Sequence, residues 1–388
     1  MTYPTRFDTL PTATWPRLRA LLDPHPPGGP VINMTIGEPK HAFPEWVGPE
    51  LAQAVAGFNK YPDNHGIPPL RVAIRDFLAR RYGAVMNPDT QIMVLNGTRE
   101  GLFNAVVALC PADTNILIPN PFYQVYTVAA MAMGAQSIYL PCTRDTGYLP
   151  DLEALDPATL AKTSAFFLCS PSNPQGAIAS VAYWTQLLRL AEHYDFKIFA
   201  DECYSEIYRD APPPGALEVA QNIGANPERV VAFHSLSKRS NVPGLRSGFV
   251  ASGPENIKRI KQLRAYAGCP VPEPVQHVSA LLWADENHVV ANRQLYCGKF
   301  TAADHIFAGI NSYHSPHAGF FLWLPVNDGE QAAMDLWTKT GVRVLPGAYL
   351  GQTVQSQNPG SGYIRVALVA PKEETQRGLE IIRDCVYK

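Results

Sequence analysis

The sequence predicts an α/β protein: a large three-layer α/β/α domain built on a mostly parallel seven-stranded sheet, and a smaller α+β domain. Between about residues 45 and 285, short runs rich in Val, Ile and Phe alternate with longer amphipathic stretches, which is typical of βαβ units around a buried sheet. After residue 285 the pattern changes to one long helical run. With 388 residues, the chain also exceeds the roughly 250–300 residues that one core usually holds.

These observations divide the chain into three parts. Residues 1–44 form an N-terminal arm and part of the small domain, residues 45–285 form the large domain, and residues 286–388 form the small C-terminal domain. The strands expected in the large domain are Ile92–Leu95, Asn115–Ile118, Ser137–Leu140, Ala165–Cys169, Lys197–Ala200, Val230–Phe233 and Gly248–Ala251, with helices such as Arg99–Leu109, Val181–His193 and Glu255–Tyr266 between them. Elsewhere we expect helices over Trp15–Leu22 and Asn287–Ala308 and strands over Phe320–Leu324 and Tyr363–Leu368.

Composition excludes several classes of protein. A net charge of -2 provides no electrostatic footprint for nucleic acid or an anionic membrane, so we expect a small-molecule partner. The chain has no stretch of about eighteen apolar residues and no signal-like start, which favours a soluble, unexported protein. Its cysteines show neither zinc-like nor CxxC spacing, and we expect reduced core thiols in a cytoplasm. They are Cys110, Cys142, Cys169, Cys203, Cys269, Cys297 and Cys385.

Polar side chains follow four of the expected strands. Ligands of an open parallel sheet bind outside the carboxyl ends of its strands, so these segments are expected to form one shared site. The segments are Asn96–Gly101, Ser170–Pro174, Asp201–Tyr204 and His234–Lys238.

The first of these segments joins a strand to a helix. Backbone N–H groups of Thr98 and Arg99, after Gly97, would face an anion together with the positive end of the helix dipole, which describes a phosphate cup. An ordinary helix cap made by Thr98 and Glu100 explains the same residues. Both interpretations stay open for this segment on its own.

The last segment adds hydroxyl groups and cations. Ser235, Ser237 and Arg246 can neutralise and orient a phosphate dianion, the arginine by bidentate hydrogen bonds. This leaves Lys238, which on a surface loop would simply be solvated. Beside a phosphate site, burial and cationic neighbours would lower its pKa, so that a neutral amine could attack an aldehyde.

An aldehyde cofactor with a phosphate group makes two more demands. A carboxylate must keep its ring nitrogen protonated, and hydrogen-bond donors must hold its phenolic oxygen. Asp201 can supply the carboxylate, whereas Glu202 would point the other way. Asn173 and Tyr204 can supply the donors. Singly, Asp201 and Asn173 are ordinary turn residues, and only their joint occurrence favours a site.

These motifs resemble the fold-type I pyridoxal-phosphate enzymes of the class I/II aminotransferase family, over nearly the whole chain and in family order. The resemblance implies that pyridoxal 5'-phosphate is bound covalently by Lys238, the lysine after S-x-S. It places Asp201 of D-x-x-Y on the pyridine nitrogen and Arg246 on the phosphate. It also places Asn173 of S-x-x-N-P and Tyr204 on the phenolic oxygen.

The resemblance implies further contacts. Tyr123 would stack on the cofactor, although core packing explains an aromatic residue equally well. Tyr61 would reach the phosphate from a neighbouring subunit, which implies a homodimer with shared active sites. Gly37 and Arg365 would hold the α-carboxylate of an amino-acid substrate, near Asn173.

Narrower features are similar to the N-succinyldiaminopimelate aminotransferases of bacterial lysine biosynthesis. The similarity lies in Ile36–His41, Asn96–Glu100, Asp201–Tyr208 and His234–Arg246. It implies ping-pong transamination of N-succinyl-LL-2,6-diaminopimelate with 2-oxoglutarate and glutamate, with Lys238 as the acid–base catalyst. Arg99 would bind the second carboxylate of each substrate, or is simply an exposed residue of a helix surface.

Three alternatives remain at the level of sequence. An enzyme of this family could prefer aspartate, aromatic or methionine donors, or could act as a carbon–sulfur lyase. A third alternative is the non-catalytic effector domain of a transcription regulator. That function needs a basic DNA-binding module ahead of the fold, and the matching region starts by residue 33.

Overall fold

The computed structural model describes residues 5–8 and 10–388, and its centre is a seven-stranded sheet. The strand order is β2-β8-β7-β6-β5-β3-β4. The strands are β2 (Ile92–Leu95), β3 (Asn115–Asn120), β4 (Gln136–Pro141), β5 (Thr163–Cys169), β6 (Lys197–Asp201), β7 (Val230–Ser235) and β8 (Gly248–Ser252). Each expected strand of this sheet is confirmed, with ends that differ by two residues at most.

One strand of this sheet runs against the others. β8 pairs antiparallel with both β2 and β7, while the remaining neighbours pair in parallel, so the prediction of a mostly parallel sheet is confirmed. β2, β3, β5, β6 and β7 consequently end at the same edge. The start of β8 lies there too, because Gly248 pairs with Ser235 and with Leu95. The polar segments after these strands therefore meet.

Helices cover both faces of the sheet, which confirms the three-layer α/β/α architecture. Adjacent residues of each buried strand point to opposite faces, so Phe166 packs in the core on one side and Phe167 in the core on the other. The first face is covered by α3 (Pro68–Tyr82), α7 (Val181–Tyr194), α8 (Ala216–Asn222) and α11 (Glu273–Ala284), and the second by α4 (Thr98–Leu109), α5 (Val125–Met133) and α10 (Pro254–Ala267).

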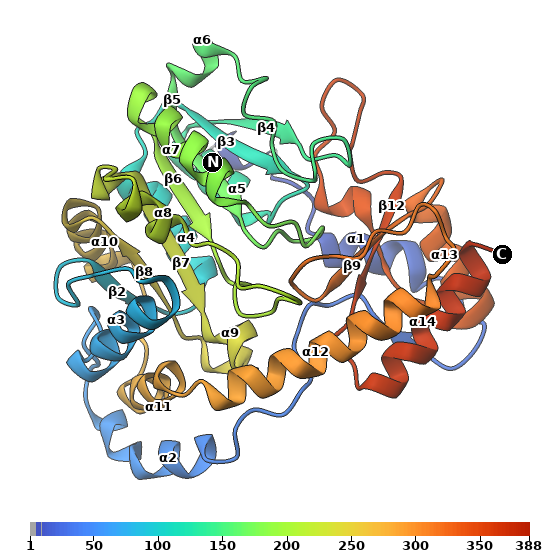
Figure 1. Cartoon of the computed structure of the whole chain (residues 1–388), viewed down its shortest axis with the longest axis horizontal. Coiled ribbons are helices and arrows are strands. Elements are labelled where there is room, and N and C mark those ends of the chain that lie inside the picture. The colour runs from blue at the N-terminus through green and yellow to red at the C-terminus, as the bar shows by residue number, and fades with distance from the viewer. Residues whose placement is uncertain (1–4, 9) are drawn as a thin grey trace.

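A second, smaller unit packs beside this sandwich (Figure 1). Its antiparallel sheet has the order β11-β12-β9, with β9 (Phe321–Pro325), β11 (Leu345–Pro346) and β12 (Tyr363–Ala367). Around this sheet lie α1 (Thr14–Leu22), α12 (Asn287–Ile306), α13 (Gly329–Thr340) and α14 (Lys372–Val386), and β1 (Ile32–Asn33) pairs in parallel with β10 (Val342–Arg343). The N-terminal arm thus joins the C-terminal part of the chain through β1.

Shorter elements lie between these helices and strands. They are the helices α2 (Val47–Gln53), α6 (Pro157–Leu160) and α9 (Leu236–Arg239), and the 3-10 turns Thr5–Phe7, Val55–Asn59, Pro227–Arg229, Pro243–Leu245 and Gly347–Leu350. In Figure 1, α12 runs from beside α11 across the molecule to α14. The expected domain bounds at residues 44 and 285 stay a prediction.

The cysteine prediction was partly wrong. Cys110, Cys142 and Cys169 are buried free thiols, as expected for core residues, but Cys269 is exposed. Cys203, Cys297 and Cys385 are half-buried. Apolar neighbours in the sequence identify a buried strand, but they do not show whether a cysteine in a loop, such as Cys269, faces the core or the solvent.

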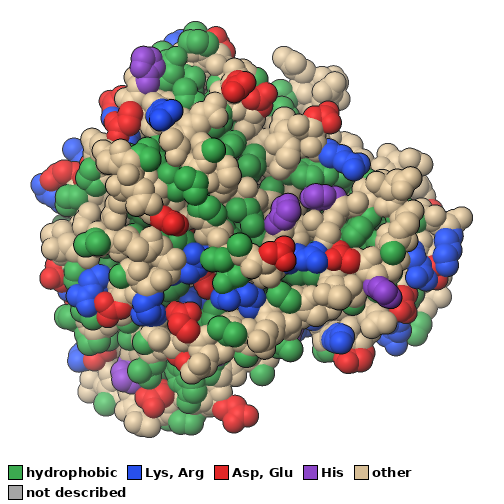
Figure 2. All heavy atoms as spheres, in the orientation of Figure 1, with side chains coloured by type: hydrophobic (Ala, Val, Ile, Leu, Met, Phe, Trp, Pro, Cys, Tyr) green, Lys and Arg blue, Asp and Glu red, His purple; other side chains and the backbone are tan. Residues whose placement is uncertain are grey.

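The surface carries no strong charge pattern on the face shown in Figure 2. Basic and acidic side chains are interspersed there, which agrees with the net charge of -2. Among the described residues, no helix combines the length and the apolar character needed to cross a membrane.

Candidate active site

A cavity of about 1160 Å³ lies at the edge where the parallel strands end. It is large enough for a cofactor together with a small substrate. The structure brings most of the predicted site residues together in its wall: Gly37, Thr98, Arg99, Tyr123, Asn173, Asp201, Tyr204, Ser235, Ser237, Lys238, Arg246 and Arg365. Four of these side chains are cationic, whereas only Glu100 and Asp201 add carboxylates, so the cavity suits an anionic ligand.

Lys238 lies in α9, directly after β7. Its Nζ donates a hydrogen bond to the carbonyl oxygen of Gly37 in the N-terminal arm. Burial lowers the pKa of Lys238 to about 8, and the positive charges of Arg365 and Arg246 act in the same direction. A larger share of this amine is therefore neutral near pH 7 than for an exposed lysine.

Asp201 is the last residue of β6 and is buried. Its carboxylate accepts hydrogen bonds from the hydroxyl of Tyr126 at 2.7 Å and from the backbone N–H of Cys203 at 3.3 Å. Glu202 faces the other way, as expected, because its carboxylate accepts from the N–H of Ala216 at 2.8 Å on the far side of the sheet. The strand end thus selects one of two adjacent carboxylates for the cavity.

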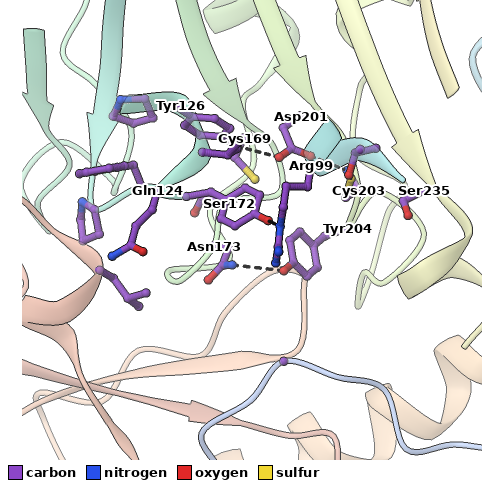
Figure 3. Close-up of a pocket in the computed structure, with 18 of the residues that line it drawn as sticks. Arg99, Gln124, Tyr126, Cys169, Ser172, Asn173, Asp201, Cys203, Tyr204 and Ser235 are labelled. Carbon is purple, nitrogen blue, oxygen red and sulfur yellow. Dashed lines mark hydrogen bonds between the residues drawn. The ribbon is translucent and has the colours of Figure 1, made fainter. Parts of the chain in front are cut away.

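Asn173 links two parts of the site. Its Nδ2 donates to the hydroxyl of Tyr204 at 3.2 Å, and its Oδ1 accepts from Nη1 of Arg365 at 3.1 Å. Figure 3 shows Asn173 and Tyr204 joined in this way, with Asp201 nearby. The same asparagine therefore contacts a residue of the large sheet region and one of the small sheet.

Arg365 is a buried arginine on β12. Its Nη2 donates to the carbonyl oxygen of Thr35 at 2.8 Å, and its buried Nε has no hydrogen-bond partner among residues 5–8 and 10–388. Burial lowers its pKa to about 10, which still leaves the guanidinium charged at neutral pH. An unpaired donor on a buried cation is costly, and a carboxylate in the cavity would offset this cost.

The start of α4 forms the proposed phosphate end of the cavity. Gly97 precedes α4 with a φ of 78°, and a Cβ atom there would overlap the guanidinium of Arg246. The backbone therefore approaches Arg246 as closely as only a glycine allows. Nearby, the Oγ of Ser235 accepts from the N–H of Ser237 at 3.1 Å, while Thr98 Oγ1 lies 3.3 Å from Cys203 Sγ.

Arg99 and Tyr123 form a pair in the cavity wall. The Nε of Arg99 donates to the hydroxyl of Tyr123 at 2.6 Å. Burial raises the pKa of Tyr123, so the hydroxyl stays protonated at neutral pH. Arg99 is exposed, as expected for a residue of a helix surface, and it also lines the cavity, as expected for a residue that binds a second carboxylate. Both interpretations of Arg99 therefore stay open.

Two predicted site residues do not line the cavity. Gly97 lies directly against the Arg246 guanidinium, and Tyr61 is fully exposed. The structure holds one chain, so it leaves the proposed role of Tyr61 in a neighbouring subunit as a prediction.

Two residues of the site were missed in the sequence. Tyr126 holds the carboxylate of Asp201 and stacks on Phe167, with ring centroids 4.3 Å apart. Cys203 lines the cavity and donates its N–H to Asp201. Helical spacing gave no signal for Tyr126, because Tyr123 lies in the turn before α5 and only Tyr126 lies on the helix.

A three-layer fold with these side chains at the ends of its parallel strands is typical of enzymes, and the excess of cationic side chains in the cavity suits a small anionic ligand. The family Aminotransferase class I and II matches residues 29–382, and the chain belongs to this family. The protein is an aminotransferase.

Individual relatives agree with this family. An LL-diaminopimelate aminotransferase from Moorella thermoacetica is 31% identical over 93% of this chain and 92% of its own. The crystal structure of an aminotransferase from Neisseria meningitidis has a TM-score of 0.93, with 36% identity over 98% of this chain and 99% of the other. The aminotransferase AspB from Helicobacter pylori has a TM-score of 0.91, with 34% identity over 99% of both chains.

Proposed function

We propose that the protein catalyses pyridoxal-phosphate-dependent transamination between an amino acid and 2-oxoglutarate. The observation that supports it most is the buried amine of Lys238 in a cationic cavity that also contains the carboxylate of Asp201. An amine with a lowered pKa suits attack on an aldehyde, and a buried carboxylate suits a protonated ring nitrogen.

The residues of the cavity fit this cofactor. The contact between Gly97 and Arg246 leaves a backbone and a guanidinium side by side, which suits a phosphate at the start of α4. Ser235, Ser237 and Thr98 would add hydroxyl groups to the same phosphate. When bound, the cofactor would supply an electron sink for the electrons released at the substrate's Cα.

The rest of the cofactor would contact the remaining predicted residues. Asp201, held by Tyr126, would bind the ring nitrogen, and Tyr123 would cover the ring. Asn173 and Tyr204, which already form a hydrogen bond, would bind the phenolic oxygen. Each of these groups is held by the protein, so little reorganisation is needed on binding.

The chain's own residues account for substrate binding and proton transfer. Arg365 and the backbone of Gly37 would bind the α-carboxylate, with Asn173 orienting the guanidinium. Lys238 Nζ, as a neutral amine, would then accept the proton from the substrate's Cα and return it during the reaction. Its contact with the carbonyl oxygen of Gly37 places this base beside the proposed carboxylate site.

The amino donor we propose is N-succinyl-LL-2,6-diaminopimelate, in lysine biosynthesis. Relatives named LL-diaminopimelate aminotransferase support the diaminopimelate part of this donor. Arg99, a cation in the cavity wall, supports a second carboxylate. Aspartate, aromatic or methionine donors and carbon–sulfur cleavage are the alternatives. Assays for released 2-oxo acid and for released ammonia separate transamination from cleavage.

Assembly and location belong to the same proposal. We place the enzyme in the cytoplasm as a homodimer with shared active sites, with Tyr61 reaching the partner's phosphate site. The full exposure of Tyr61 and the free state of the cysteines support this proposal.

The decisive experiment replaces Lys238. Pyridoxal phosphate is added to the purified protein, borohydride reduction traps covalent attachment, and mass spectrometry identifies the modified peptide. Lys238→Ala should lose the attachment and retain less than about one thousandth of the transaminase activity. Lys258→Ala, at a lysine with 63% side-chain exposure, is the matched control and should change neither the covalent attachment nor the transaminase activity. Near wild-type turnover by Lys238→Ala would contradict the proposal.

A further inference from the structure

A second pocket, of about 380 Å³, lies apart from the active site and shares none of its lining residues. It lies between the N-terminal arm, α12 and the start of α14, two helices that are side by side in Figure 1. The cationic or titratable residues in its wall are Lys40, His41, Lys299 and Lys372. None of the described residues in its wall carries a carboxylate, so this pocket differs from the mixed charge of the surface shown in Figure 2.

Lys299 is the unusual member of this group. Its side chain is 2% exposed, and its Nζ bonds to the carbonyl oxygen of Leu368 at 2.9 Å and to Nε2 of His41 at 2.7 Å. Within the described part of the chain it has no carboxylate partner. A buried ammonium without a counter-ion is costly. An ammonium has three N–H groups, so one of them is left for a ligand.

The surroundings of Lys299 add positive charge. Burial lowers the pKa of Lys299 to about 8, and the charge of Lys40 acts in the same direction. Lys40 and Lys372 are exposed and form no ion pair among the described residues. Glu373 and Glu374 follow in the first turn of α14, but neither bonds to these lysines.

The other wall of the pocket is apolar. Leu295, which is 53% exposed, and Pro371 provide it, and the volume fits a small metabolite. Lys372 is the first residue of α14, so the positive end of a fifteen-residue helix also faces this region.

We propose that this pocket is an effector site for a small aliphatic carboxylate. The carboxylate group would pair with Lys299, Lys40 and Lys372, and the hydrocarbon part would lie against Leu295 and Pro371. Such a ligand supplies the counter-ion that Lys299 lacks and covers an exposed leucine.

The pocket is connected to the active site by hydrogen bonds. His41 Nδ1 pairs with Oδ1 of Asn292 at 2.9 Å, and Nδ2 of Asn292 donates to the backbone carbonyl of Lys238 at 3.4 Å. Asn241 also donates to Oδ1 of Asn292, at 3.0 Å. The arm that carries His41 also carries Gly37, whose carbonyl oxygen contacts Lys238 Nζ. A ligand that fixes His41 would therefore act on the segment that positions Lys238.

The test measures binding of butyrate to the full chain by calorimetry at constant ionic strength. We expect the double variant Lys40→Gln/Lys372→Gln to weaken one binding event by about tenfold, as expected for the loss of two partly exposed charges. Lys258→Gln, which removes an exposed lysine elsewhere, is the matched control and should bind like the wild type. The double variant should leave the affinity of butyrate for the active site unchanged, because Lys40 and Lys372 do not line that cavity. Equal affinity of the double variant and the wild type would overturn the proposal.

Two further measurements locate the site. Lys299→Met should abolish the same binding event. Circular dichroism checks that the variant is folded, because the Leu368 carbonyl and His41 lose a hydrogen-bond donor. Butyrate should also slow amide hydrogen exchange over residues 36–41 and 294–299. Binding that survives in Lys299→Met, or chloride binding as tight as butyrate, would each overturn the proposal.

Discussion

At the scale of single residues, the lowered pKa of Lys238 determines how the protein should respond to pH. Because burial lowers this pKa to about 8, the neutral amine appears as pH rises through about 8 rather than through the usual 10.5. The rate of covalent attachment of pyridoxal phosphate should therefore rise from about pH 7 and level off above about pH 9. Stopped-flow absorbance with borohydride trapping measures this rate. A rate that keeps rising to about pH 10.5 would contradict the lowered pKa.

Arg365 should tolerate no substitution by lysine. Its guanidinium binds Asn173 and Thr35 through two different nitrogens of one planar group. A lysine has a single nitrogen, which cannot reach both partners and also bind a carboxylate in bidentate fashion. Arg365→Lys should raise KM by at least about tenfold for every amino donor, since all carry an α-carboxylate.

Arg99→Ala provides the comparison for Arg365→Lys. It should raise KM only for donors that carry a second carboxylate, because Arg99 lies in the wall of the cavity and not at the proposed α-carboxylate site. Steady-state kinetics with glutamate and alanine distinguish the two variants. An equal effect of Arg99→Ala on both donors would rule out the distal role of Arg99.

At the scale of elements, the turn between β2 and α4 requires a glycine at position 97. Gly97→Ala would combine a positive φ with an overlap between Cβ and the Arg246 guanidinium. We expect it to weaken pyridoxal-phosphate binding by more than about tenfold, because Arg246 must move away from the start of α4. Titration of the cofactor, followed by absorbance, measures this loss.

Gly83→Ala is the matched control for this turn. Gly83 also has a positive φ, of 64°, but a Cβ atom there meets nothing within 4 Å. The control should lose about 1 kcal/mol of stability through backbone strain and keep its cofactor affinity. A similar loss of affinity in both variants would mean that strain, and not the overlap with Arg246, is responsible.

The sequence predicted the elements better than their contacts. Runs such as Phe166–Leu168 identify buried strands because they are continuous and apolar, but the antiparallel direction of β8 leaves no such mark. The polar residues at the strand ends were predicted because the ends of parallel strands share one edge. The bond between Tyr126 and Asp201 was missed because it joins residues 75 positions apart across the sheet.

At the scale of the whole molecule, shared active sites can be tested by mixing inactive subunits. Lys238→Ala and Tyr61→Ala should each be strongly impaired, since Lys238 acts within its own cavity and Tyr61 in the partner's. A random mixture of the two, made by co-expression, should recover about a quarter of wild-type activity, because each mixed dimer contains one intact site. Activity equal to the mean of the two parents would show that each site uses one chain only.

The hydrogen bond between Arg365 and Asn173 joins β12 of the small sheet to the segment after β5 of the large one. Asn173 also donates a hydrogen bond to Tyr204, so a movement of Arg365 that shifts the Asn173 amide also changes its bond to Tyr204. A carboxylate bound by Arg365 while Asn173 orients the guanidinium would hold the Asn173 amide in place for the cofactor's oxygen. Thermodynamic linkage then requires reciprocity: the factor by which a bound carboxylate changes retention of the cofactor equals the factor by which the cofactor changes affinity for the carboxylate.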